Sequence, residues 1–193
     1  MTFCRMTESN LTPPRSVRTS RLSPLYAGIF FLALVSGCAG TPDGVTVVSE
    51  FEIDRYLGTW YEVARLDHSF ERGLSAVTAD YSLRQDGGVR VVNRGYNEKS
   101  GEWDEAIGKA YFVGASDIGQ LKVSFFGPFY GGYNIIELDK SGYQYSLVAG
   151  PDRDYLWILS RAAQMQPDTL RSLVNKAREL GFATDELIFV KHD

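Results

Sequence analysis

Cysteine and histidine are scarce in this sequence of 193 residues, and each shortage excludes a class of protein. The two cysteines are Cys4 and Cys38, so the remainder of the chain holds no pair for a disulfide framework. The two histidines, His68 and His192, are too few for a clustered zinc site or a histidine-dependent hydrolase. We therefore predict no metal ion, no cofactor and no catalytic residues. We expect His68 to be a solvated loop residue.

Long hydrophobic runs are also nearly absent. The longest uncharged stretch covers residues 22–42, and its apolar core is residues 25–35. A spanning helix needs about 20 predominantly apolar residues, so an uncleaved membrane helix is the weaker interpretation. Three arginines precede the run, which gives the positive and then apolar order of a secretory signal: Arg15, Arg18 and Arg21.

The end of this run resembles a bacterial lipobox. Leu34-Val35-Ser36-Gly37 leads directly to Cys38, so the resemblance implies a lipoprotein signal peptide at residues 1–37. The mature N-terminus is then Cys38, carrying acyl groups such as palmitate, and several acyl chains suffice for stable anchoring. Ala39 favours the outer membrane, with the domain facing the periplasm. A signal peptide cleaved without lipidation remains the alternative. We interpret residues 38–49 as an acylated N-terminal tether.

Positive charge is in short supply as well. The chain has a net charge of −4, and removal of residues 1–37 takes away four arginines and one glutamate, which leaves −7. An acidic domain of this kind is not expected to bind nucleic acid or to adhere broadly to anionic lipid. The 156 residues that remain, 38–193, fit one domain, which we place at residues 50–193 after the tether.

Short runs rich in β-branched and aromatic residues fill the middle of the chain. Turn sequences such as Gln85-Asp86-Gly87-Gly88 separate them, and this regular spacing predicts an all-β sandwich or barrel. The eight expected strands cover residues 59–66, 77–83, 89–96, 103–113, 120–126, 133–139, 143–149 and 155–161.

One helix is expected after the strands. Pro167 suits a first helical position, apolar residues then recur at helical spacing, and Gly181 suits a left-handed stop. The helix is therefore predicted over residues 167–181, packed on the outside of the sheet. Residues 187–190 resemble a final short strand.

The identity of the barrel rests on particular residues. Gly58-Thr59-Trp60 resembles the Gly-x-Trp signature of lipocalins, and Arg161 resembles the arginine that packs across the ring of that tryptophan. Longer strings at residues 56–62, 93–97, 125–134 and 150–157 are similar to bacterial outer-membrane lipocalins of the apolipoprotein D-like group. The resemblance covers residues 45–190. It implies a lipocalin (calycin) fold, which is an eight-stranded, up-and-down, antiparallel β-barrel with one C-terminal α-helix outside.

Alternation along barrel strands assigns the side chains that face the interior. Parity with Trp60 places these side chains inside: Val77, Ala79, Tyr81, Val89, Val91, Asn93, Leu121, Val123, Phe125, Tyr155, Trp157 and Leu159. As ligand-binding residues we predict Tyr81, Asn93, Val123, Phe125, Tyr155 and Trp157, and for Tyr81, Asn93 and Trp157 the family resemblance implies the same. Glu62 has interior parity too. A packed core with no room for a ligand is the alternative.

Loop order predicts which loops surround the open mouth. Alternate loops of an up-and-down barrel share one end, and here they cover residues 67–76, 97–102, 127–132 and 150–154. They carry the aromatic residues Phe70, Phe129 and Tyr130. We expect these to gate the interior or to contact a membrane or partner chain, unless they pack beneath their own loops.

The resemblance implies a lipid-binding protein rather than an enzyme. Fatty acids or lysophospholipids are the expected ligands, held at the outer membrane by the lipid anchor for envelope maintenance, and a homodimer is possible. Two alternatives remain open. One is a lipocalin-type enzyme that uses Glu62 for acid or base chemistry, and the other is an interaction module with a vestigial interior.

Overall fold

A computed structural model describes residues 40–192 of the chain. The predicted signal peptide at residues 1–37 and the predicted lipidation site Cys38 lie outside these described residues. Within residues 40–192, no helix has both the length and the apolar character needed to cross a membrane.

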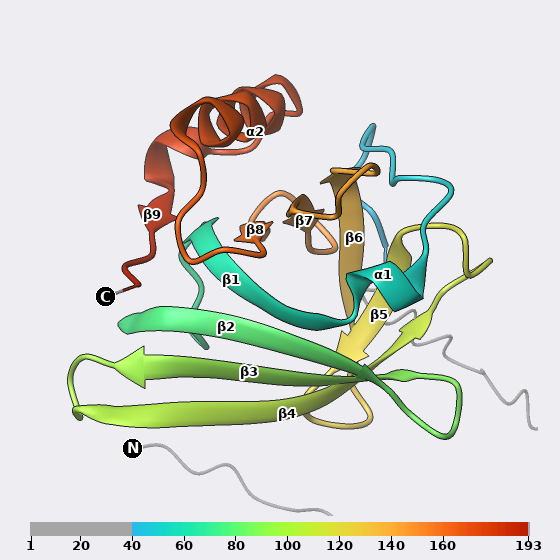
Figure 1. Ribbon diagram of the computed structural model, residues 1–193, viewed down its shortest axis with the longest axis horizontal. Helices are drawn as coiled ribbons and strands as arrows, with labels where there is room; N and C mark the ends of the chain where they lie inside the picture. The colour runs from blue at the N-terminus through green and yellow to red at the C-terminus, as the bar shows by residue number, and fades with distance from the viewer. Residues whose placement is uncertain (1–39, 193) are drawn as a thin grey trace, which may run out of the picture. The chain divides into compact units, whose positions relative to one another are not determined.

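The chain forms a closed antiparallel barrel (Figure 1). Strands β1 to β8 neighbour one another in sequence order, and pairing of β8 with β1 closes the ring. The bounds are α1 Ile53–Tyr56, β1 Gly58–Arg65, β2 Leu74–Leu83, β3 Val89–Asn97, β4 Glu102–Phe112, β5 Gln120–Ser124, β6 Gly131–Leu138, β7 Tyr145–Ala149 and β8 Leu156–Ser160. Each strand begins and ends within three residues of its predicted range, and the predicted up-and-down barrel is confirmed.

Alternating side chains separate the barrel interior from its outer surface. In β3, Val89 and Val91 point inward and are buried, whereas Arg90 and Arg94 are exposed. The interior cluster joins aromatic and aliphatic residues of β1 to β8, including the fully buried Trp60. The β-branched and aromatic residues that predicted the strands therefore supply the wall of the interior.

Helix α2, Pro167–Glu179, packs outside the barrel (Figure 1). Its buried residues Leu173 and Ala177 join an outer hydrophobic cluster with Leu156 and Ile158 of β8. The helix begins at Pro167 as predicted. It ends two residues before Gly181, which adopts a φ of 84° in the left-handed region that glycine tolerates. The 3₁₀ helix η1, Thr184–Glu186, and strand β9, Ile188–Phe189, follow, and β9 pairs with β1.

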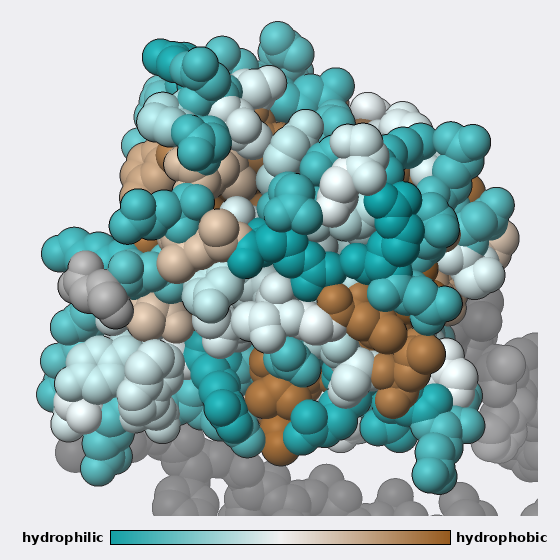
Figure 2. Space-filling view, in the orientation of Figure 1, coloured by the Kyte–Doolittle hydropathy of each residue, from teal (hydrophilic) through white to brown (hydrophobic). Residues whose placement is uncertain are grey.

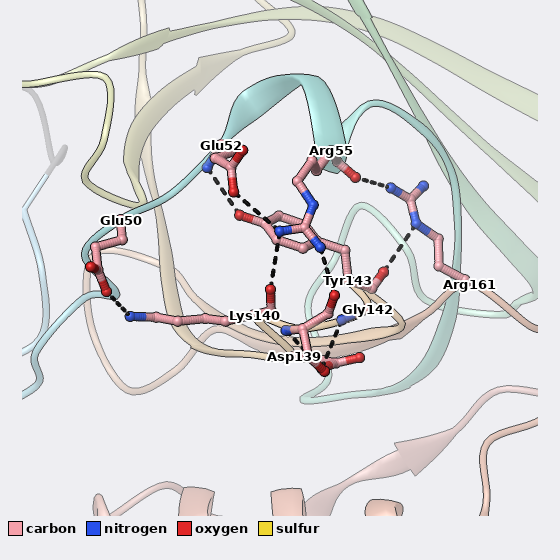
Figure 3. Close-up of polar contacts among 9 residues, drawn as sticks. Glu50, Glu52, Arg55, Asp139, Lys140, Gly142, Tyr143 and Arg161 are labelled. Carbon is pink, nitrogen blue, oxygen red and sulfur yellow. Dashed lines mark hydrogen bonds and ion pairs between the residues drawn. The ribbon is translucent and has the colours of Figure 1, made fainter.

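One end of the barrel is closed by α1 and the residues around it (Figure 3). The indole Nε1 of Trp60 donates to the carbonyl oxygen of Tyr56 at 2.8 Å, and the guanidinium of Arg161 lies 4.1 Å from the Trp60 ring centroid. Arg161 also donates to the carbonyl oxygens of Arg55 and Thr59. The predicted partnership between Trp60 and Arg161 is thus present, and it ties α1 to β1 and β8.

Residues 40–49 form part of the folded domain. The amide Nδ2 of Asn134 donates to the carbonyl oxygen of Gly40 at 2.9 Å, and the backbone N–H of Val48 donates to the carbonyl oxygen of Ile135 at 2.9 Å. The expected tether of residues 38–49 is therefore not a free spacer from Gly40 onward. Its backbone N–H and C=O groups form hydrogen bonds with Asn134 and Ile135 of β6, and these bonds hold the segment against the barrel.

Candidate ligand-binding cavity

A cavity of about 730 Å³ occupies the barrel interior. Such a volume lies within the range of small-molecule sites, about 300–1,000 Å³. Most of its wall is aliphatic or aromatic. All six residues predicted to bind a ligand line it: Tyr81, Asn93, Val123, Phe125, Tyr155 and Trp157. The expectation of a packed core without room for a ligand is wrong for this barrel.

Three tyrosine hydroxyls form a polar group at the floor of the cavity. The hydroxyl of Tyr133 lies 2.8 Å from that of Tyr56 and 2.9 Å from that of Tyr81. Tyr56 also donates to the Oγ of Ser146 at 3.3 Å. Burial raises the pKa of Tyr56 to about 12, so the hydroxyl stays neutral and keeps its proton for hydrogen bonding. The floor is therefore polar but uncharged.

A buried ionic cluster lies on the wall formed by β1 and β8. Arg65 donates to Glu62 at 2.7 Å, and the exposed fraction of both side chains is 5% or less. Arg65 also donates to the carbonyl oxygen of Glu71 at 2.8 Å, and the indole Nε1 of Trp157 donates to the Glu71 carboxylate at 3.1 Å. Glu62 and Glu71 both line the cavity. The wall thus presents carboxyl oxygens to an otherwise apolar space.

The two glutamates of this cluster resist ionisation. Burial raises the pKa of Glu62 well above its ordinary value, and the neighbouring carboxylate of Glu71 raises it further. Burial also raises the pKa of Glu71, against the hydrogen bond from Trp157, which lowers it. Because one arginine faces two carboxyl groups, the cluster favours a state in which the two groups share a proton.

His68 is buried, and the prediction that it is solvated is wrong. Its exposed fraction is 6%, because it packs between Phe70, at a ring distance of 4.1 Å, and Trp157, at 5.1 Å. Its Nε2 lies 3.3 Å from Glu71 Oε2 without the alignment of a hydrogen bond. Burial lowers the pKa of His68 to about 4, so the ring is neutral near pH 7. Phe70 of the first mouth loop, residues 66–73, and Trp157 of β8 form this shelter.

Asn93 brings a free acceptor to the cavity wall. Its Oδ1 is buried and has no hydrogen-bond partner among the described residues. A buried acceptor without a partner loses the hydrogen bonds that water would supply. A ligand hydroxyl or N–H group placed beside it would restore that bond.

Aromatic residues at the open end are strongly exposed. Phe126 and Phe129 have exposed fractions of 80% and 77%, and Phe70 has 58%. Tyr130 instead is half-buried, with its ring 6.5 Å from that of Tyr111. The alternative that the mouth aromatics pack beneath their own loops is therefore wrong for Phe129, whereas Phe70 stacks on His68 of its own loop and stays partly exposed. Strand β5 ends at Ser124 and β6 begins at Gly131. Phe126, which was predicted within a strand, therefore belongs to the mouth loop between β5 and β6.

A second hollow, of about 810 Å³, lies on the outer surface beside β3 and β4. It is bordered by charged residues such as Arg94 and Glu105, which form an ion pair of 2.6 Å. This hollow lacks the apolar enclosure of the barrel interior. In residues 40–192 there is also no group of three or more side chains suited to hold a metal ion.

Comparison with known proteins decides the family. A model of the lipocalin-like domain matches residues 51–192. The chain is a lipocalin. It is 57% identical to the outer membrane lipoprotein Blc of Vibrio cholerae over 82% of the chain and 92% of that relative. It is 54% identical to the Blc lipoprotein of Escherichia coli over 89% of the chain and 97% of that relative.

More distant relatives agree on the fold. Rat apolipoprotein D is 28% identical over 75% of the chain and 84% of that protein. The solved structure of insecticyanin from the tobacco hornworm matches with a TM-score of 0.63 and 20% identity, covering 80% of this chain and 87% of that one. The similarity to the outer membrane lipoproteins extends over almost their full lengths. This lipocalin is accordingly a lipid-anchored protein of the outer membrane.

Proposed function

We propose that this lipocalin binds fatty acids or lysophospholipids in its cavity, without catalysing their conversion, and stores or carries them at the outer membrane. The observation that carries the proposal is the cavity of about 730 Å³ with its mainly apolar and aromatic wall. Burial of a methylene group contributes about 0.8 kcal/mol, so an acyl chain would supply most of the binding free energy. The anchor, through acylated Cys38, keeps the barrel in the periplasm, close to the membrane that supplies such lipids.

Polar groups in three parts of the cavity support the proposal that the ligand is a lipid with a polar head group. The tyrosine hydroxyls lie at the floor, Asn93 Oδ1 on the wall, and the carboxyl groups of Glu62 and Glu71 on the β1 and β8 side. These groups can orient a ligand, because a few polar atoms in an apolar site fix its direction more than they fix its affinity.

The direct test is native mass spectrometry of the delipidated protein. It would be titrated separately with lysophospholipids, fatty acids, haem and retinoids. We expect one lysophospholipid or fatty acid per barrel, and therefore two per homodimer if two copies associate. Failure of every lipid to bind at micromolar concentrations would refute the proposal.

An acid or base catalyst in the cavity is the second candidate function. The raised pKa of the buried Glu62, which lines the cavity, favours it because such a group can donate a proton near neutral pH. The test compares turnover of bound lipids by the native protein and by Glu62→Gln. Product formed by the native protein and lost in the variant would support catalysis, and no product in either would exclude it.

A further inference from the structure

The described chain enters the fold at the open end of the barrel. The side-chain amide of Asn134 donates from one nitrogen to the carbonyl oxygens of Gly40, at 2.9 Å, and Gly150, at 2.8 Å. Gly150 begins the loop between β7 and β8, one of the loops at the mouth. A Cβ atom on Gly132, next to the mouth loop between β5 and β6, would lie 2.6 Å from the Gly40 oxygen. Gly40 is therefore fixed beside the mouth.

From Gly40 the chain runs away from the mouth. Ser49 bridges to Ile118, the N–H of Phe51 donates to the carbonyl oxygen of Asp117 at 2.8 Å, and α1 then covers the closed end. The direction of the segment is fixed by these bonds. Anything attached on the N-terminal side of Gly40 consequently leaves the fold at the open end.

The proposed site of the anchor, Cys38, precedes Gly40 by only two residues in the sequence. Two extended residues span at most about 7 Å, so an acyl group attached two residues before Gly40 would be joined to the fold beside the mouth. An acyl group on Cys38 would thus bring the open rim toward the bilayer that receives it.

The two ends of the barrel differ in chemistry. Phe126, Phe129 and Phe70 are exposed at the open rim. The N–H of Phe129 donates to the carbonyl oxygen of Phe126 at 3.1 Å, which fixes the backbone of this turn, and the ring of Phe70 stacks on His68.

The closed end presents charged groups around α1 instead (Figure 3), and its exposed apolar residues Leu83 and Val113 belong to separate strands or their ends. Arg55 pairs with Glu52 at 3.1 Å, and Lys140 pairs with Glu50 at 3.1 Å. Figure 2 shows one face, on which hydrophobic side chains form only a few separate patches. Exposed apolar groups gathered at one end of a protein mark an interaction surface.

We propose that the open rim lies against the phospholipid surface that holds the anchor, with the rings of Phe126, Phe129 and Phe70 in the boundary between head groups and acyl chains. Apolar rings on a surface element can enter this boundary to a depth of about 5–10 Å. A lipid would then pass between bilayer and cavity without crossing bulk water. This inference rests on the proposed acylation of Cys38.

Single labels in the acylated mature protein test the orientation. The sequence holds no cysteine besides Cys4 and Cys38, so the mature protein accepts one new thiol. Phe129→Cys places a nitroxide label at the open rim. Leu83→Cys is the matched control, because Leu83 is 56% exposed and ends β2 at the closed end. Both variants are placed in vesicles of phosphatidylethanolamine and phosphatidylglycerol, and collisions with oxygen and with a water-soluble nickel chelate are compared.

The expected result is a higher ratio of oxygen to nickel collisions at position 129 than at position 83, as for a label inside the bilayer. Equal ratios in protein that floats with the vesicles would overturn the orientation and leave ligand binding intact. Protein that does not float would overturn both this inference and the proposed anchor. A third outcome is measured without lipid. If nitroxide labels at position 129 are then shielded from the nickel chelate and show spin coupling to one another, the rim is an interface between two copies, which also overturns the inference.

Discussion

The indole nitrogen of Trp157 donates a hydrogen bond of 3.1 Å to the carboxyl group of Glu71. Trp157 belongs to β8 and lines the cavity, whereas Glu71 belongs to the first mouth loop, 86 positions earlier in the chain. The bond therefore fastens a loop of the open end to the inner wall. Because Glu71 also faces Glu62 and Arg65, the contact that fastens this loop is part of the titratable cluster.

Replacement of Glu71 by glutamine should change how stability depends on pH. The pKa of Glu71 and that of Glu62 are raised above the ordinary value of 4.5, so above that pH the folded state holds a proton that the unfolded state has released. The free energy of unfolding of the native protein then falls as pH rises, by up to about 1.4 kcal/mol per unit for each such proton. Glu71→Gln loses part of this dependence.

Urea denaturation of the native protein and Glu71→Gln at a series of pH values measures the effect. We expect the difference in unfolding free energy to shift in favour of the variant as pH rises from 4.5 to neutral. A difference that stays constant over that interval would show that the cluster holds no additional proton.

Replacement of His68 by phenylalanine should change the pH dependence of stability in the opposite direction, over nearly the same pH interval. The pKa of His68 is lowered from 6.5 to about 4, because burial opposes its charge. The unfolded state takes up a proton below pH 6.5 that the folded state accepts only near pH 4, so this contribution to stability is lost as pH falls between those values. His68→Phe keeps a ring between Phe70 and Trp157 without the titration.

Thermal unfolding of His68→Phe and of the native protein, followed over acid pH, checks this expectation. The variant should lose less stability than the native protein between pH 6.5 and 4. Parallel losses in the two proteins would contradict a buried, neutral His68.

Removal of the Arg161 side chain should loosen the closed end. Arg161→Ala loses the cation–π contact with Trp60 and the hydrogen bonds to Thr59 and Arg55. We expect a decrease of about 2 kcal/mol in the free energy of unfolding, measured by urea denaturation. Arg161→Lys keeps the charge but not the planar fork, so an intermediate loss should follow. Equal stability of all three proteins would remove the structural role assigned to this pair.

Asn134→Ala should release the N-terminal segment from the barrel. Asn134 is fully buried and joins Gly40, Thr41 and Gly150 through its side chain. Loss of these bonds should cost about 2–3 kcal/mol and leave buried groups unpaired. Hydrogen exchange of residues 40–51 should quicken, whereas the exposed Asn175→Ala on α2 should leave it unchanged. Unaltered exchange in Asn134→Ala would contradict the fixed position of Gly40.

The barrel was predictable from the sequence because its signals are local. Alternation in the strands and turn residues between them depends on neighbours two to four positions apart, and the same alternation placed Tyr81, Asn93 and Trp157 on the inner wall. Pro167 and the apolar stripe after it likewise predicted α2.

The parts that were missed depend on distant contacts. Tyr56 meets Tyr133 across 77 positions of the chain, and the short helix α1 that carries Tyr56 has little periodicity of its own. Glu71 and His68 read as polar loop residues, because nothing near them in sequence shows that the loop folds back on Trp157. Residues 40–49 resemble a tether in composition, and their partners lie in β6.

The proposed function depends most on the claim that an acyl chain occupies the cavity. The most direct test is calorimetric titration of the delipidated protein with lysophospholipids of increasing chain length, together with Val123→Trp, which fills the cavity, and Val113→Trp, whose exposed position lies outside its lining. The native protein and Val113→Trp should bind one ligand, about fourfold more tightly for each added methylene, and Val123→Trp should bind far more weakly. Affinity independent of chain length, or unchanged in Val123→Trp, would contradict the claim.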